Sequence, residues 1–340
     1  MKIAIGYRIQ SGPWGGGNRF AATLAEHLRA SGHQVVFDLA DADIDIILLT
    51  DPRSRSSSVS FAAGAITRYL LVRNPRALVV HRINECDERK GTRGMNNALV
   101  LANWCADFTV FVGSWLLDLP VWREHLRTPH SVILNGADAR IFNSQGIRPW
   151  DGNGPLRLVT HHWGGNWMKG FDIYQRIDEL MATPEFKGRI EFSYVGNVPK
   201  GFSFKNARLV APLDGVALAE ELKRHHVYVT GSINEPGGNH QNEAGACGLP
   251  LMYRRSGCLP EYCEGFGISI DEHDFDAVLR KMFAEYPAQR AAMSAWPHLS
   301  DRTCSQYGRL FEDLLKHREE LLATRNLWAK PLLLLQNQLF

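Results

Sequence analysis

The sequence predicts an α/β protein with two doubly wound parallel β-sheets, one after the other along the chain. Short apolar runs of strand length alternate with helix-length segments over most of the 340 residues. The alternation stops at residues 146–155, which are rich in glycine, proline and polar side chains, and then begins again. A chain of this length can form two domains, each with its own hydrophobic core.

The composition is that of an ordinary globular protein. The formal net charge of +2 gives no reason to expect a nucleic-acid partner. The six cysteines include no Cys-x-x-Cys pair, which argues against a zinc site or a disulfide framework and favours a reducing compartment. The sequence opens on a strand rather than a signal peptide, and no apolar run reaches the roughly 18 residues of a membrane span. We therefore expect a soluble, cytoplasmic protein.

The first series of elements begins with a strand at residues 2–6, a glycine-rich turn within residues 11–20, and a helix. Backbone N–H groups near Gly16 and Gly17 could approach a phosphate or a sugar, although a merely flexible turn is the alternative. The dinucleotide fingerprint Gly-x-Gly-x-x-Gly is not met, because Phe20 stands at its third glycine. NAD is therefore disfavoured.

The other strands are expected at apolar runs that suit parallel sheets buried on both faces. In the first series these runs are residues 31–37, 44–49, 78–80, 109–112 and 131–138. In the second series they are residues 156–159, 190–195, 207–210, 227–229, 251–253 and 267–270. Ligands of such sheets bind beyond the carboxyl ends of the strands, so polar residues that follow these runs are candidates for a site.

His81 directly follows the run at residues 78–80 and opens an unusually polar segment that includes Arg82, Asn84 and Glu85. Polar residues at a strand end are placed to contact a substrate. A histidine whose hydrogen bonds are satisfied inside the structure is the plainer alternative.

The stretch at residues 227–250 carries the clearest motif, a strand followed by a glycine loop between Glu235 and Glu243. A carboxylate can accept hydrogen bonds from a pair of vicinal hydroxyls. Gly237 and Gly238 let backbone N–H groups approach a ligand closely. The segment after Glu243 can begin a helix, whose first N–H groups bind anions. Two surface glutamates spaced in this way by chance are the alternative.

This stretch resembles the donor-binding signature of retaining glycosyltransferases of the GT-B fold, family 4, also called glycosyl transferases group 1. Glu235 and Glu243 match its Glu-x7-Glu hallmark, residues 248–250 its Gly-x-Pro, and residues 260–261 its later Pro-Glu. The resemblance implies two Rossmann-like domains that face an interdomain cleft.

The resemblance also implies a division of the chain. Residues 1–147 would form the acceptor-side domain and residues 148–305 the nucleotide-sugar donor domain. Residues 306–340 would form a helix and tail that cross back to the N-terminal domain, and the tail is expected to be buried there or to touch a membrane surface.

In this family the first loop of the donor domain uses an arginine and a lysine to neutralise the donor diphosphate. Lys169 matches the lysine, but the arginine is missing, as in a bacterial His-His-Trp variant of the family. The resemblance therefore implies that Lys169 supplies the fixed charge and that His162 or Asn166 adds hydrogen bonds. A metal site is disfavoured, because adjacent side chains of an extended segment such as His161 and His162 point opposite ways.

The implied reaction moves a sugar from a nucleotide-diphosphate sugar to an acceptor hydroxyl with retention, without a required metal or cofactor. Glu235 would bind hydroxyls of the transferred sugar and Glu243 the ribose, and Glu235, Lys169 and His81 are the implied catalytic residues. The implied donor contacts are Gly16, Gly17, His162, Asn166, Gly196, Gly237, Gly238, Asn239, His240 and Glu243. Arg82, Asn84 and Glu85 are the expected acceptor-side residues.

The implied setting is bacterial polysaccharide, lipopolysaccharide or lipid-linked glycan synthesis, with a glycan or lipid-linked acceptor and a peripheral contact at the inner membrane face. Two alternatives stay open: a sugar-nucleotide epimerase or hydrolase on the same fold, and a catalytically silent nucleotide-sugar-binding subunit. The missing arginine keeps the second alternative open. Replacing Glu235 by glutamine is expected to abolish transfer and to leave the thermal melt near that of the wild type.

Overall fold

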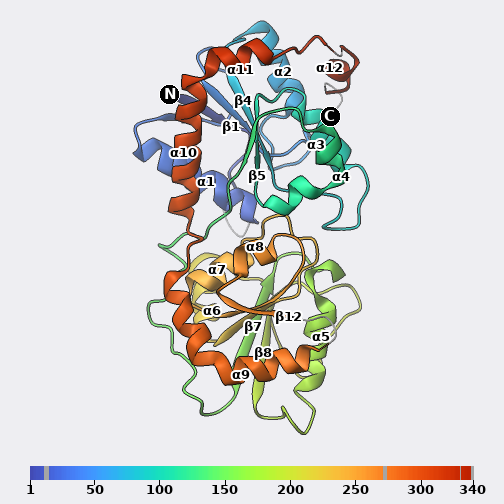
Figure 1. The fold of residues 1–340 in the computed structure, drawn as a ribbon, viewed down its shortest axis with the longest axis vertical. Helices are drawn as coiled ribbons and strands as arrows, with labels where there is room; N and C mark the ends of the chain where they lie inside the picture. Colours follow the sequence, from blue (N-terminus) through green and yellow to red (C-terminus); the bar gives the residue numbers. More distant parts are fainter. Residues whose placement is uncertain (11–14, 271–273, 330, 338–340) are drawn as a thin grey trace. The chain divides into compact units, whose positions relative to one another are not determined.

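The computed structural model describes residues 1–10, 15–270, 274–329 and 331–337 (Figure 1). The chain divides into two compact units, Met1–Leu134 with Asp301–Phe340, and Asn135–Ser300. Each unit contains a six-stranded sheet in which all strand pairs are parallel. The expected α/β class with two doubly wound sheets is therefore confirmed.

The sheet of the first unit has the strand order β2-β1-β3-β4-β5-β6. Its strands are β1 (Lys2–Ile5), β2 (Gln34–Val36), β3 (Ile46–Leu49), β4 (Leu78–Ile83), β5 (Phe108–Phe111) and β6 (His130–Val132). The helices that alternate with them are α1 (Gly16–Ala30), α2 (Ala63–Val72), α3 (Met95–Asn103), the 3-10 turn η1 (Ser114–Asp118) and α4 (Pro120–His125). Every residue of β3 and β4 is buried, as in a parallel sheet covered on both faces.

Two boundaries in this unit differ from those expected. Strand β4 runs on to Ile83, because His81, Arg82 and Ile83 continue the pairing with β5, so His81 lies inside the strand and not after it. Helix α1 begins at Gly16, so Gly16 and Gly17 lie in its first turn. Residues 11–14 of the expected glycine-rich turn lie outside the described residues.

The sheet of the second unit has the order β12-β11-β10-β7-β8-β9. Its strands are β7 (Leu156–His162), β8 (Ile190–Gly196), β9 (Arg208–Val210), β10 (Val227–Thr230), β11 (Leu251–Arg254) and β12 (Gly267–Ile270). Its helical segments are η2 (Trp167–Lys169), α5 (Phe171–Leu180), α6 (Gly215–Lys223), α7 (His240–Ala246), α8 (Leu259–Cys263), α9 (Phe275–Ala292) and η3 (Met293–Ala295). Apolar residues of the sheet, α5 and α9 form its core.

The change from the first unit to the second lies at residues 134/135, ahead of the glycine- and proline-rich linker. The segment after β6 is held by the second unit: the Asn135 N–H donates to the Tyr262 hydroxyl at 2.7 Å. Ala137 forms a β-bridge with Leu299. The composition indicated a linker at residues 146–155, whereas these contacts show that the second unit begins before it.

The C-terminal helices α10 (Ser300–Lys316), α11 (Arg318–Thr324) and α12 (Pro331–Asn337) belong to the first unit from Asp301 onward. Cys304, Tyr307, Phe311 and Leu314 recur at helical spacing on α10 and join the core formed by β1, β3 and α1. No helix in the described part of the chain is long and apolar enough to cross a bilayer.

All six cysteines are buried thiols. Burial raises the pKa of Cys86, Cys105 and Cys247 to about 12, because a thiolate is poorly solvated among apolar neighbours.

Among the described residues, three arginine–carboxylate pairs connect the C-terminal segment to the rest of the first unit: Arg76 with Glu319, Arg318 with Asp45, and Arg325 with Asp107. Arg325 Nε lies 2.8 Å from Asp107 Oδ1, and the side chains of the two residues are only 10% and 3% exposed. Burial raises the pKa of Asp107, although Arg325 acts in the opposite direction. The side chains of the Arg76–Glu319 pair, by contrast, are 57% and 73% exposed.

We predict that Arg325→Ala lowers the free energy of unfolding by about 3–5 kcal/mol, because it leaves the Asp107 carboxylate buried without its cation. Arg76→Ala is the matched control and should cost about 0–1 kcal/mol, because water solvates both partners. Urea denaturation of both variants measures the difference. Equal effects would show that burial does not govern the Arg325 contact.

Candidate functional site

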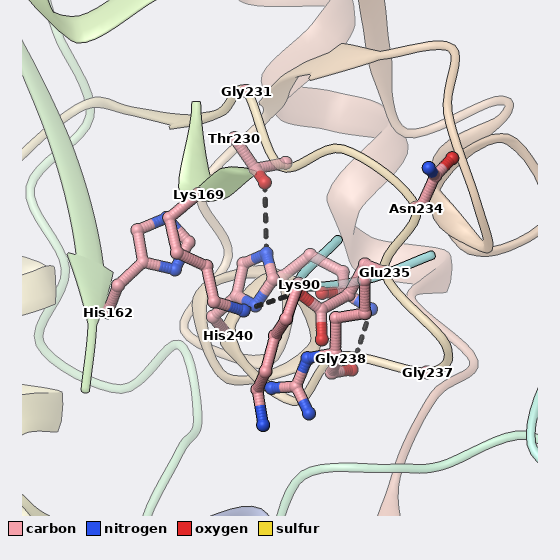
Figure 2. Close-up of polar contacts among 12 residues, drawn as sticks. Lys90, His162, Lys169, Thr230, Gly231, Asn234, Glu235, Gly237, Gly238 and His240 are labelled. Carbon is pink, nitrogen blue, oxygen red and sulfur yellow. Dashed lines mark hydrogen bonds and ion pairs between the residues drawn. The ribbon is translucent and has the colours of Figure 1, made fainter. Parts of the chain in front are cut away.

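The candidate site lies in the second unit, at the carboxyl ends of β7 and β10, where the turn before α5 meets the loop before α7 (Figure 2). Gly170 adopts a left-handed φ of 94°, and a Cβ there would lie 2.4 Å from the Gly231 backbone. The Ile233 N–H also donates to the Met168 carbonyl at 2.8 Å. The two loops are therefore in direct backbone contact, which brings Lys169 against the second loop.

Glu235 is held by its backbone. Gly257, with a φ of 59°, approaches so closely that a Cβ would lie 2.4 Å from the Glu235 nitrogen. The Cys258 N–H donates to the Glu235 carbonyl at 2.9 Å. Asn234 takes a left-handed φ of 52° and donates its N–H to the Ser256 hydroxyl at 3.0 Å. The segment before α8 therefore fixes the position from which the Glu235 side chain extends.

Lys169 and Glu235 form a buried ion pair. Lys169 Nζ lies 2.5 Å from Glu235 Oε2, and the two side chains are 9% and 5% exposed (Figure 2). Each group needs the other, because a single charge with so little contact with water would be strongly destabilising. A site that contains this pair holds both a cation and an acceptor of hydrogen bonds at one point.

Glu243 lies on α7, which begins at His240. The expectation of a helix that starts after Glu243 is therefore wrong: the Glu243 N–H already donates to the Asn239 carbonyl at 2.8 Å, within the helical turn. The Glu243 carboxylate meets His161 at the end of β7, with Oε2 2.8 Å from Nε2. The two carboxylates of the motif thus have different basic partners.

Three histidines gather beside these pairs. The ring of His240 lies 4.7 Å from that of His162 and 6.3 Å from that of His161, measured between centroids. His240 Nε2 is 2.9 Å from the Thr230 hydroxyl (Figure 2). Within the described ranges no group of three or more histidine, cysteine or acidic side chains has the arrangement of a metal site.

His162 is hydrogen-bonded to Tyr174 on α5. The Tyr174 hydroxyl oxygen accepts from the Gly231 N–H at 3.2 Å and from the Thr160 hydroxyl at 3.2 Å. His162 Nε2 lies 2.7 Å from the same hydroxyl, and burial raises the Tyr174 pKa above its ordinary value. Tyr174 thus ties His162 at the end of β7 to the loop that follows β10.

Two of the predicted glycines of this unit, Gly196 and Gly238, are closely packed against other residues. At Gly196, with a φ of 136°, a Cβ would lie 1.9 Å from the His162 carbonyl oxygen. At Gly238 it would lie 2.6 Å from the Gln241 side chain, which also donates to the Gly238 carbonyl at 2.7 Å. Gly237 accepts from the Asn135 amide at 2.7 Å. These contacts fix the loop that carries Glu235.

Two predicted polar residues flank these loops. Asn166 immediately precedes η2 and accepts the Lys169 N–H at 3.0 Å through its carbonyl. Asn239 immediately precedes α7. The structure therefore brings Glu235, Glu243, Lys169 and their predicted neighbours into one region of the second unit.

His81, predicted to contact a sugar, is fully buried in β4, and its Nδ1 lies 2.9 Å from the Asn103 amide oxygen. Burial lowers the pKa of His81 to about 4, so the ring is neutral near pH 7. The Thr109 hydroxyl donates to the same Asn103 oxygen at 3.0 Å. One ring nitrogen of His81 is thus bonded inside the first unit, whereas its buried Nε2 meets no hydrogen-bond partner among the described residues, and the contact of His81 with a sugar stays a prediction.

The three residues expected on the acceptor side also have partners within the first unit. The Arg82 guanidinium stacks on Phe20 at 3.9 Å from the ring centroid. The Asn84 amide, in the orientation that suits both neighbours, donates to the Thr50 carbonyl at 3.2 Å and accepts from Arg82 at 2.8 Å. Glu85 pairs with Arg89 at 3.0 Å and with Lys90 at 3.2 Å.

Sequence reasoning missed the residues that position the site. The sequence indicated no contact between His161 and Glu243, and Tyr174 and Gly257 were not singled out. The signals were weak: Gly257 stands close to the Pro-Glu of the motif, but nothing in its neighbours indicates a backbone contact with Glu235.

No family model matches the chain, and no curated protein matches it. Solved structures are similar to it in fold. Sucrose-phosphate synthase from Thermosynechococcus elongatus has a TM-score of 0.64 at 16% identity, covering 93% of this chain and 99% of that one. HepE from Anabaena in complex with UDP-glucose has a TM-score of 0.63 at 12% identity, covering 92% and 100%. A glycosyltransferase from Rickettsia africae has a TM-score of 0.63 at 13% identity, covering 93% and 98%.

At these identities the likeness establishes the fold. The match extends over nearly the full length of each chain, so it includes both sheets and the order of their elements. The expected GT-B architecture, with two Rossmann-like α/β domains, is therefore confirmed.

The buried pair changes the expected stability of variants at Glu235. We predict that Lys169→Met or Glu235→Gln alone lowers the free energy of unfolding by about 3–5 kcal/mol, because each removes one half of a buried ion pair and keeps the other buried charge. The double variant should recover most of this loss, because both charges are removed. Thermal and urea melts of the four proteins give the coupling energy, and additive losses would contradict a buried pair.

A second prediction concerns the backbone contact behind Glu235. Gly257→Ala should lower stability far more than Gly265→Ala, although both glycines have a positive φ, of 59° and 84°. Only at Gly257 would the new Cβ meet backbone, whereas the space around Gly265 is open. The Gly265 variant therefore reports the cost of the φ angle alone, and the difference between the two melts measures the steric contact. Similar melts for both variants would contradict it.

Proposed function

We propose that this protein is a glycosyltransferase that moves a sugar from a nucleotide-diphosphate sugar to an acceptor hydroxyl. The observation that carries the proposal is the buried Lys169–Glu235 pair, 2.5 Å apart at the carboxyl edge of the second sheet, with Glu243 on the adjoining helix. The GT-B fold supports it, because structures of that fold include HepE in complex with UDP-glucose. Ligands of such sheets bind at this edge.

The pair contains the two chemical groups that such a donor requires. An ammonium group binds the oxygens of a diphosphate, and a carboxylate accepts hydrogen bonds from sugar hydroxyls. When the donor binds, Lys169 exchanges Glu235 for phosphate and Glu235 exchanges Lys169 for hydroxyls. Neither charge is then left alone in a buried place, which is the condition for a buried charge to be tolerated.

Transfer of the sugar breaks its bond to the diphosphate, and negative charge develops on the leaving oxygen. Lys169 is the group assigned to that charge, because preorganised cations and donors in a site sheltered from water stabilise developing charge most effectively. His162, whose Nε2 contacts Tyr174, is assigned a hydrogen bond to the donor. It therefore replaces only part of what the family's missing arginine would supply.

The finer assignments rest on the resemblance of the motif. They are retention of configuration, transfer of a hexose, and no requirement for a metal or other cofactor. The proposed setting is synthesis of a bacterial polysaccharide, lipopolysaccharide or lipid-linked glycan at the cytoplasmic face of the inner membrane, which the protein would contact peripherally.

The test is a panel of nucleotide-diphosphate sugars, followed for slow donor hydrolysis and, with glycan and lipid-linked acceptors, for transfer. The wild type should release the nucleoside diphosphate from at least one donor. Lys169→Met/Glu235→Gln, which removes both charges together, should slow release by at least about 100-fold, the scale for loss of one group that stabilises developing charge. Arg280→Met/Glu185→Gln removes an exposed ion pair of the same unit and should stay active.

Two results would replace the proposal. Conversion of the donor sugar with no acceptor product over the whole panel would identify an epimerase or hydrolase. Tight binding of nucleoside diphosphates without turnover of any donor would identify a binding subunit.

A further inference from the structure

The second unit contains two buried histidine–glutamate contacts, His161 with Glu243 and His225 with Glu221, and they differ in a way that indicates their roles. Both histidines and both glutamates are buried. The difference lies in how many of the ring nitrogens have a partner. The ring of His225 packs as part of the core, whereas the ring of His161 is hydrogen-bonded to a carboxylate.

His225 is satisfied on both sides of its ring. Nδ1 lies 2.8 Å from the Glu221 carbonyl oxygen and Nε2 lies 2.9 Å from the Ser193 hydroxyl. The Glu221 carboxylate takes its hydrogen bonds from Arg208 and Arg224, and only approaches His225 at 4.0 Å. Burial lowers the pKa of His225 to about 4. This ring is a structural element of the core.

Among the described residues, the ring of His161 makes one hydrogen bond. Its Nε2 lies 2.8 Å from Glu243 Oε2, whereas its buried Nδ1 meets no hydrogen-bond partner among the described residues. The Glu243 carboxylate accepts, so Nε2 carries the proton and Nδ1 is the side of the ring left unsatisfied. The bond to Glu243 is the hydrogen bond that offsets part of the free-energy cost of burying this ring.

The backbone of His161 is fixed from a neighbouring strand. The Tyr228 hydroxyl on β10 accepts the His161 N–H at 3.2 Å and donates to the His161 carbonyl at 3.3 Å. The Tyr228 ring also lies 5.5 Å from the imidazole, edge to face, and the His240 ring lies 6.3 Å away on another side. The donor nitrogen that reaches Glu243 is therefore held in place by residues of β7, β10 and α7.

We propose that His161 is a positioning residue that orients the Glu243 carboxylate to accept the two hydroxyls of the nucleotide's ribose. This inference rests on the proposed function, in which Glu243 binds the ribose. A carboxylate has about four acceptor positions on its two oxygens, and His161 occupies one on Oε2. The bond fixes the plane of the carboxylate, and a fixed plane suits the fixed geometry of a vicinal diol.

The test compares the affinity of the protein for UDP and GDP with that for their 2′-deoxy counterparts, measured by calorimetry. The wild type should prefer the ribonucleotide by about tenfold or more, the scale of one hydrogen bond to a charged group. His161→Ala should bring this ratio close to one by weakening ribonucleotide binding. His161→Gln should keep most of the ratio, because its amide nitrogen can replace the Nε2 donor.

His225→Ala is the matched control, since it also removes a buried histidine that contacts a glutamate in the same unit. His225→Ala should lower the melting temperature and leave the ratio of ribonucleotide to deoxyribonucleotide affinity unchanged. If His161 were purely structural, His161→Ala would have the same two effects. A loss of stability alone does not change the ratio of the affinities for the ribonucleotide and the deoxyribonucleotide.

Three results would overturn the inference while the proposed function stands. They are an unchanged ratio in His161→Ala, an equal loss of affinity for both nucleotides in that variant, and a wild type that binds both nucleotides equally well. A wild type that binds none of these nucleoside diphosphates and releases none from any donor contradicts the proposed function itself.

Discussion

The arrangement of the second unit depends on one interaction, the ion pair between Lys169 and Glu235. The two residues are 66 positions apart in the sequence and yet meet at 2.5 Å, both almost completely buried. Such a contact needs exact placement of both backbones. Gly170 supplies it on one side by touching Gly231, and Gly257 on the other by touching the Glu235 backbone. Absence of a side chain at these glycines is what allows the charges to meet.

The two carboxylates of the motif are similar in sequence and different in their surroundings. Glu235 faces the ammonium group of Lys169, whereas Glu243 faces the imidazole of His161, whose backbone is fixed by Tyr228. The first environment favours exchange of partners with a charged ligand, because both members of the pair can find new partners together. The second favours a fixed acceptor. The loop and helix therefore provide two kinds of carboxylate at one edge of a sheet.

Much of the fold could be predicted from the sequence, because buried parallel strands are short apolar runs and all of the expected runs contain strands. Where polar residues continue a strand, as at His81, the apolar run is shorter than the strand and predicts its end too early. The helix at Glu243 began earlier than expected because His240 gives no apolar signal. The motif located the site, but the pairing of Lys169 with Glu235 and the role of His161 depend on tertiary contacts, which no local pattern encodes.

The burial of the thiols gives each half of the molecule its own reporter of opening. Cys86, Cys105 and Cys304 lie in the first unit, and Cys247, Cys258 and Cys263 in the second. A sheltered thiol reacts with an alkylating reagent only when the surrounding structure opens, so the rate of modification follows local unfolding. Mass spectrometry of modified peptides could thus follow the opening of the two halves separately in one sample, without an introduced label.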